Sequence, residues 1–157
     1  MADQKPPRLD GTERETVLGL LRYQRESLVR KLEGIDDDDA RRSPVASGTS
    51  LLWLARHMAR AEVTWVLRRW AGRDVPLGDD AVGPDDRLSD AVAAYRAAWA
   101  DVDAALGDAP LDQLCRAPDA EPNVNLRWVL MHLLEETARH AGHADILREL
   151  IDGSVGR

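Results

Sequence analysis

The residues best suited to chemistry lie close together in the stretch 128–143. This stretch contains His132, Glu136, His140 and His143, which follow one another at spacings of four, four and three residues. In an α-helix, where successive residues turn by about 100°, these side chains fall within roughly 80° of one another and share one face. Imidazole and carboxylate groups are donors that divalent transition metals bind. The spacing therefore predicts a metal site on this helix.

The same face is expected to point into a core. Five apolar side chains lie on that side of the helix: Trp128, Val129, Ile146, Leu147 and Leu150. Burying an unpaired imidazole or carboxylate would cost on the order of several kcal/mol, so each group needs a bound cation or a hydrogen-bonding partner. Arg139 lies at the edge of the face and offers the main alternative to a metal, a buried ion pair with Glu136.

A fifth polar residue, His57, is expected to lie on a second helix. Its neighbours on the helical wheel are Trp53, Leu54, Ala61 and Thr64, which give it a largely apolar surrounding. Metal sites in helical bundles commonly take ligands from facing helices. A set of imidazole and carboxylate donors suits Zn²⁺, Ni²⁺ or Fe²⁺ better than Ca²⁺. A single helical histidine more often packs or hydrogen-bonds than binds metal, so the prediction depends on the whole set.

The elements that must position these residues are helical. No stretch alternates apolar and polar residues as a β-strand does, and apolar periodicity predicts four helices. The first opens on the capping box Thr12–Glu15 and stops at Gly34, the second runs from Thr49 or Ser50 to before Gly72, the third is capped near Ser89 and ends at Gly107, and the fourth runs from Asn123 or Asn125 to Gly153. We therefore predict an all-α fold, a four-helix bundle.

The connection between the second and third helices is long for a bundle, at about 17 residues between Gly72 and Leu88. It lets the third helix cross over, so simple up-and-down topology does not follow. The acidic run 36–39 is predicted to be a solvated loop, because it lacks the spacing of a calcium-binding loop. We expect one domain over residues 1–157, with residues 1–10 flexible, the lone Cys115 packed inside, and the tryptophans in the core or at helix contacts.

Composition narrows the class of protein. The net charge is −7 and the cations are spread among acidic residues, so the basic stripe needed to bind nucleic acid is missing. No apolar run approaches the ~20 residues of a membrane span, and the N-terminus has no apolar signal region. One cysteine excludes an internal disulfide. These features favour a cytoplasmic protein that acts on a small molecule, with neither nucleic acid nor a membrane as partner.

Two segments, 51–65 and 132–148, resemble the DinB/YfiT-like superfamily of metalloenzymes, as in actinobacterial DinB family proteins, and the resemblance covers nearly the whole chain. It implies a four-helix bundle, many of whose members are dimers, with a divalent metal held by one histidine of the second helix and a pair from the last. By position, His57 matches the first ligand and Glu136 with His140 matches the pair, although many members have histidine where Glu136 stands. His143 stands where glutamine often lies, and it is a candidate ligand or an outer partner.

The resemblance also implies a class of activity. Some members are transferases or isomerases that use mycothiol, bacillithiol or glutathione. We therefore expect a metal-dependent enzyme, a thiol S-transferase or a hydrolase, with Zn, Ni or Fe, a low-molecular-weight thiol as cosubstrate, and a homodimeric state. The alternative is a non-enzymatic stress-response or ligand-binding bundle whose polar core holds no metal. The choice between Glu136 and His143, and the part of His132, stay open.

Overall fold

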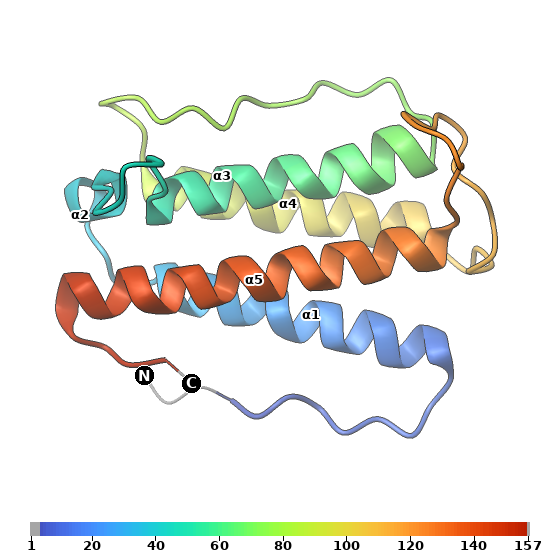
Figure 1. Ribbon diagram of the computed structural model, residues 1–157, viewed down its shortest axis with the longest axis horizontal. Helices are drawn as coiled ribbons and strands as arrows, with labels where there is room; N and C mark the ends of the chain where they lie inside the picture. Colours follow the sequence, from blue (N-terminus) through green and yellow to red (C-terminus); the bar gives the residue numbers. More distant parts are fainter. Residues whose placement is uncertain (1–3, 157) are drawn as a thin grey trace.

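The computed structural model describes residues 4–156, and this range is all-helical (Figure 1). The elements in chain order are α1 (Glu13–Leu32), α2 (Asp37–Arg41), α3 (Leu51–Glu62), its π-helical continuation η1 (Val63–Trp70), α4 (Leu88–Leu106) and α5 (Leu126–Asp152). Within the described range, β pairing is limited to an isolated bridge between Leu114 and Asn125. The all-α prediction is confirmed, and the four long helical segments are compatible with the predicted bundle. None of the helices between residues 4 and 156 is long and apolar enough to span a membrane.

Several helix ends lie where local capping residues predicted them. Thr12 and Glu15 form the reciprocal capping box of α1. Ser50 caps α3 by accepting from the backbone N–H of Trp53, and Asn125 caps α5 in the same way. At the other end of α5, Gly153 has a φ of 73°, a left-handed conformation that glycine adopts without strain.

Two predictions about the start of α4 and the acidic run are wrong. The run is not a loop: Asp36 caps the short helix α2 by accepting from the N–H of Asp39. The helix α4 begins at Leu88, and the cap is not Ser89. Its first N–H donates 2.8 Å to Asp37 Oδ1, so a carboxylate of α2 takes the capping role from a distant part of the chain.

The long helices pack in two close pairs, α1 along α5 and α3 along α4. Figure 1 shows that residues 71–87, which we call the strap, run back along the outside of α3 before α4 begins. As a result α3 and α4 are parallel, while α1 and α5 run the opposite way. The strap is therefore the crossover connection that its length permits, and it joins α3 to the parallel helix α4.

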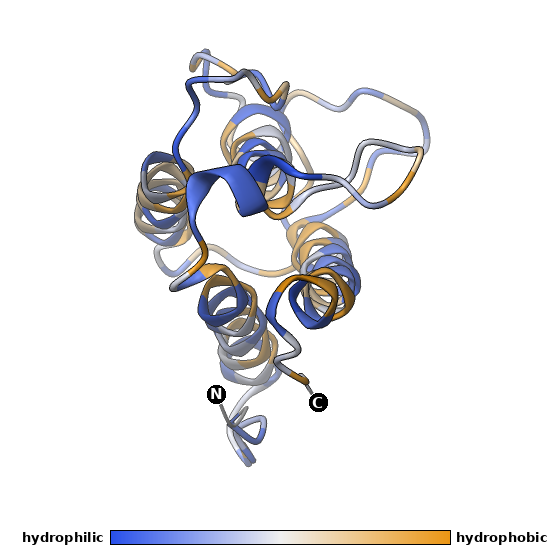
Figure 2. Ribbon diagram, turned by 90° about the vertical axis from the view of Figure 1, so that its left-hand side faces the viewer, coloured by the Kyte–Doolittle hydropathy of each residue, from blue (hydrophilic) through white to orange (hydrophobic). Residues whose placement is uncertain are grey.

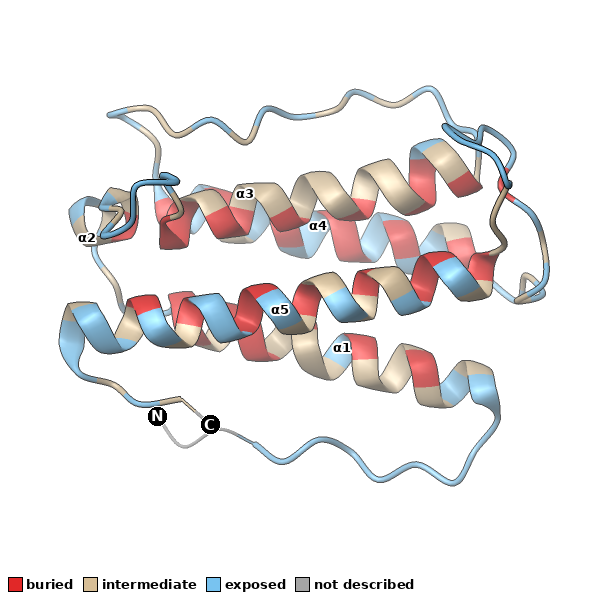
Figure 3. Ribbon diagram, in the orientation of Figure 1, coloured by how far each residue is buried: buried red, intermediate tan, exposed pale blue. Residues whose placement is uncertain are grey.

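The core fills the space between these helices. Viewed nearly end-on, the four long helices surround a shared interior (Figure 2). Buried positions recur along each of them (Figure 3) and form two adjoining clusters, one around Leu54 and Met58 and one around Leu130 and Leu133. Cys115 is free and buried, as expected.

The inward face of α5 differs from the predicted one. Val129 and Leu147 are buried, but Trp128, Ile146 and Leu150 are 45%, 61% and 63% exposed. At about 100° per residue, the centre of the buried face lies roughly 80° from the centre of the polar face that carries His132, Glu136, His140 and His143. The leucines and alanines on the neighbouring face, such as Leu133, form a more continuous apolar stripe than the predicted face, and they are the residues buried in the core. The polar group therefore lies at the edge of the core.

Candidate metal centre

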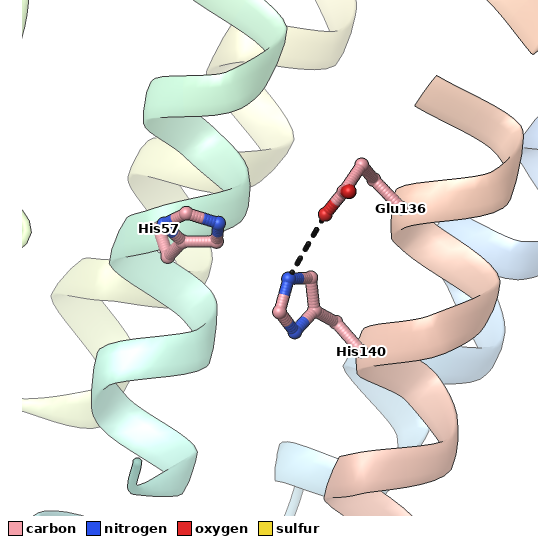
Figure 4. Close-up of side chains that lie close together, drawn as sticks. All are labelled: His57, Glu136 and His140. Carbon is pink, nitrogen blue, oxygen red and sulfur yellow. Dashed lines mark ion pairs between the residues drawn. The ribbon is translucent and has the colours of Figure 1, made fainter. Parts of the chain in front are cut away.

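Three of the predicted donors meet between α3 and α5. One ligand atom each from His57, Glu136 and His140 lies within 4.8 Å of the others. His140 Nε2 is 3.2 Å from Glu136 Oε2, and Figure 4 shows His57 reaching toward this pair from the facing helix. Residues about 80 positions apart in the sequence thus form one group, as the prediction of facing helices requires.

His140 is the most buried member of the group, at 8% exposed, while His57 and Glu136 are partly buried. Burial, and after it the proximity of His57, lower the pKa of His140, and the carboxylate of Glu136 opposes both effects; the resulting pKa is about 4. The His140 imidazole is therefore neutral at pH 7. Neutral imidazole is the form that binds a metal ion.

Each imidazole of the group has a partner on its other ring nitrogen. His57 Nδ1 lies 3.2 Å from Asp80 Oδ2 in the strap, and His140 Nδ1 lies 3.3 Å from His143 Nδ1. The ring of Trp53 stacks on His57 at a centroid distance of 4.5 Å. Metal-binding histidines are commonly oriented by such outer contacts.

The other two histidines lie outside the three-donor group. His143 is exposed and contacts the group only through His140, among the contacts of the described residues. His132, one turn before Glu136, stacks on Trp128 at 5.0 Å and meets the edge of Trp65 at 4.5 Å.

The predicted ion pair between Glu136 and Arg139 is present, but it is not buried. Arg139 Nη1 lies 3.0 Å from Glu136 Oε1, the arginine side chain is 50% exposed, and it also binds Glu135 at 2.7 Å. Since Oε1 takes this contact, Oε2 is the oxygen that faces His140. The Glu136 carboxylate thus contacts the half-exposed Arg139 with one oxygen and His140 with the other.

The donor set fits a divalent transition metal. Bonds of about 2.0–2.2 Å place two donors of a tetrahedral site roughly 3.4 Å apart. The His140–Glu136 separation of 3.2 Å already matches this spacing. The 4.8 Å limit on the whole group means that His57 needs only a small inward shift. Three protein donors leave a coordination position for another molecule.

Sequence reasoning missed two features of the structure, one beside the donor group and one elsewhere in the core. Asp80 lies in a strap without periodicity, so no pattern singled it out. The second feature is a buried ion pair in which Arg25 Nε and Nη2 contact the carboxylate of Glu62 at 2.7 and 2.6 Å, just before η1 begins. Burial raises the pKa of Glu62, and Arg25 opposes that rise. An arginine and a glutamate at buried positions of two amphipathic helices were the available signal.

A cavity of about 520 Å³ lies under the strap, between α3 and α4. Its lining includes the small side chains of Ala59, Ala94 and Ala98 and charged residues such as Arg60 and Asp90. None of the three donors, His57, Glu136 and His140, lines this cavity. The strap therefore touches both this cavity and, through Asp80, the donor group.

Comparisons with known proteins agree with this fold. Residues 16–153 match the sequence family described as Mycothiol-S-transferase. A search among curated proteins gives no match. Among solved structures, the chain is similar to the crystal structure of a conserved protein from Enterococcus faecalis, with 17% identity, a TM-score of 0.65, and coverage of 92% of this chain and 99% of that one. At this identity the likeness shows a shared fold.

Proposed function

Because the chain belongs to the mycothiol S-transferase family, which is DinB-like, we propose that it joins a low-molecular-weight thiol, through its sulfur, to an electrophilic centre of a small molecule. Mycothiol is the first candidate for the thiol. The observation that carries the proposal is the convergence of His57, Glu136 and His140 within 4.8 Å. We propose these three residues as ligands of Zn²⁺, Ni²⁺ or Fe²⁺, with His143 as an outer partner of His140.

The chemistry follows from these residues. A divalent cation held there would lower the pKa of a bound thiol and hold its thiolate. His140 stays neutral at pH 7, so its imidazole carries one proton and one lone pair, and the Nε2 proton that faces Glu136 would move to Nδ1 for Nε2 to bind the cation. Glu136 supplies a negative charge that favours a cation in the group. In the transfer, the thiol loses its proton to water, a sulfur–carbon bond forms, and the leaving group departs with the electrons of its bond to carbon.

We propose a single four-helix bundle domain that works in the cytoplasm as a homodimer. Its substrates are small molecules.

A second candidate function is a ligand-binding or stress-response bundle without metal. The observation that favours it is that the polar groups already have protein partners. Glu136 binds Arg139 and His140, and His57 binds Asp80. A network satisfied in this way needs no cation to offset burial.

Metal analysis combined with a thiol titration separates the two candidates. Protein purified without a polyhistidine tag is expected to contain about one divalent metal ion per chain. In the cobalt-substituted protein, mycothiol should produce a sulfur-to-cobalt charge-transfer band in the near ultraviolet, because the thiolate binds at the open position.

The controls use histidines of the same helix. His140→Ala should lose both the metal and the band while its far-ultraviolet circular dichroism stays helical. His132→Ala should keep both, because His132 lies outside the donor group. Full metal content in His140→Ala would contradict the ligand assignment. A spectrum that millimolar thiol leaves unchanged would favour a metal-dependent hydrolase or a binding protein.

A further inference from the structure

Asp80 is the acidic residue of the strap that reaches the donor group. Its Oδ2 lies 3.2 Å from His57 Nδ1, and both side chains are about one-third exposed, at 31% and 30%. An ionised carboxylate can only accept a hydrogen bond, so the Nδ1 atom must carry the proton. A neutral imidazole has one N–H, and Nε2 is then left with its lone pair free.

The segment that carries Asp80 is held by the same helix that carries His57. Arg56 Nε and Nη2 donate to the carbonyl of Asp79 at 3.1 and 2.9 Å. Arg60 Nη1 donates to the carbonyl of Gly78 at 2.9 Å. The two carbonyls come directly before Asp80, so the arginines on either side of His57 in α3 fix the position from which Asp80 reaches it.

Two contacts together define the pose of the His57 ring. Trp53 lies nearly parallel to it, with an angle of 15° between the ring planes, and this stacking sets the plane of the imidazole. Stacking alone does not distinguish the two orientations that differ by a half-turn of the ring. The hydrogen bond to Asp80 does distinguish them, because only one orientation places Nδ1 at the carboxylate.

We propose that Asp80 is a positioning residue that holds His57 as the Nδ1–H tautomer and aims its Nε2 lone pair at Glu136 and His140. The strap thereby has a function beyond joining α3 to α4. The statement that Nε2 binds a metal rests on the proposed function above. The tautomer itself needs no metal, so the two can be tested separately.

The first measurement uses the full-length protein without metal. Long-range proton–nitrogen NMR of the histidine rings reports which nitrogen carries the proton. The wild type should show the Nδ1–H tautomer at His57, and Asp80→Ala should shift His57 toward Nε2–H or a mixture. Asp79→Ala is the matched control: it removes a neighbouring carboxylate, which accepts from Ala81 N, and keeps the carbonyl that Arg56 binds. The control should leave the His57 tautomer unchanged.

The second measurement is Zn²⁺ affinity by competition with a chromophoric chelator. Loss of an outer partner should weaken binding about 10- to 100-fold in Asp80→Ala. Asp79→Ala should bind as the wild type does. If Asp80→Ala does not fold, Asp80→Leu tests the same point, because it keeps a side chain of similar length and removes the acceptor that favours a proton on Nδ1.

An Nδ1–H tautomer at His57 that persists without the Asp80 carboxylate would overturn the proposal, as would an equal change in Asp79→Ala. Two results together would refute the metal function and support the positioning role: the wild-type protein binds no Zn²⁺, and Asp80→Ala loses the Nδ1–H tautomer of His57. If the protein binds Zn²⁺ and the His57 tautomer is the same in Asp80→Ala as in the wild type, the metal function is supported and the positioning role of Asp80 is refuted.

Discussion

Glu136 and His143 flank His140 along α5 and make different contacts with it. The carboxylate of Glu136 faces Nε2, on the side of His57, while His143 contacts Nδ1. We therefore expect Glu136→Gln to weaken metal binding more than His143→Ala does. The loss for His143→Ala should be that of an outer partner, about 10- to 100-fold. Isothermal titration with Zn²⁺ measures both, and negligible effects in both variants would refute both roles.

The lowered pKa of His140 predicts a pH dependence of stability in the metal-free protein. Its pKa lies near 4 in the folded chain, against an ordinary value of 6.5. Between these values the unfolded chain binds a proton that the folded chain does not, so the free energy of unfolding falls as the pH is lowered through this window.

His140→Gln should lack this contribution, which is at most about 1.4 kcal/mol per pH unit. Urea denaturation at several pH values between 7 and 4, with a chelator present, gives the two slopes. Identical slopes for the wild type and the variant would show that His140 is protonated equally in both states.

Helical spacing predicted that His57 and the polar face of the last helix meet in a bundle, and the family resemblance selected His57, Glu136 and His140 from that set; the structure brings these three together. The sequence was not sufficient for Asp80. That residue reaches His57 through the path of the strap, which depends on arginine contacts to backbone carbonyls. Such contacts have no period in the sequence.

Among the elements, α3 and η1 are fixed against α1 by the buried pair of Arg25 and Glu62. The side chains are 3% and 0% exposed, and Asp103 adds a contact to Arg25 at 3.1 Å. Arg25→Met leaves the Glu62 carboxylate buried without its partner. We expect it to lower the free energy of unfolding by about 3–5 kcal/mol.

The matched control is the exposed pair of Arg127 and Glu13, whose side chains are 42% and 54% exposed. Arg127→Met should cost much less than Arg25→Met, because solvent screens an exposed ion pair. Replacing Arg25 and Glu62 together with Met and Leu should recover much of the loss. Denaturant unfolding compares all three variants, and equal costs for the two single variants would contradict the effect of burial.

Helix ends could be predicted where the cap is local, as at Thr12, Ser50 and Asn125. The start of α4 could not, because its capping acceptor is Asp37, 51 residues earlier in the chain. The face of α5 was also missed. Two apolar stripes compete on that helix, and only packing against α1 and α3 decides between them.

For the whole molecule, exposed apolar side chains on α5 support the proposed homodimer. Trp128, Met131, Ile146 and Leu150 are each at least 45% exposed. An isologous interface would bury them against their counterparts. Analytical ultracentrifugation should give about twice the chain mass of 17.4 kDa.

Ile146→Asp should shift that equilibrium toward the monomer, because a charge in an apolar interface loses its hydration. Val45→Asp is the control, since Val45 is exposed at 47% but lies far from α5 in sequence, in the turn before α3. A mass near 17.4 kDa at every concentration would refute the dimer.

The pairing of α1 with α5 joins the first and the last of the described helices, and it gives the biosynthesis of this protein a fixed order. A chain emerging from the ribosome can form α1, α3 and α4 early, but α1 finds its partner only after α5 has been made. Two of the three donors, Glu136 and His140, arrive on that same last helix. A nascent chain therefore presents only His57, and it gains the full donor set in the step that closes its core.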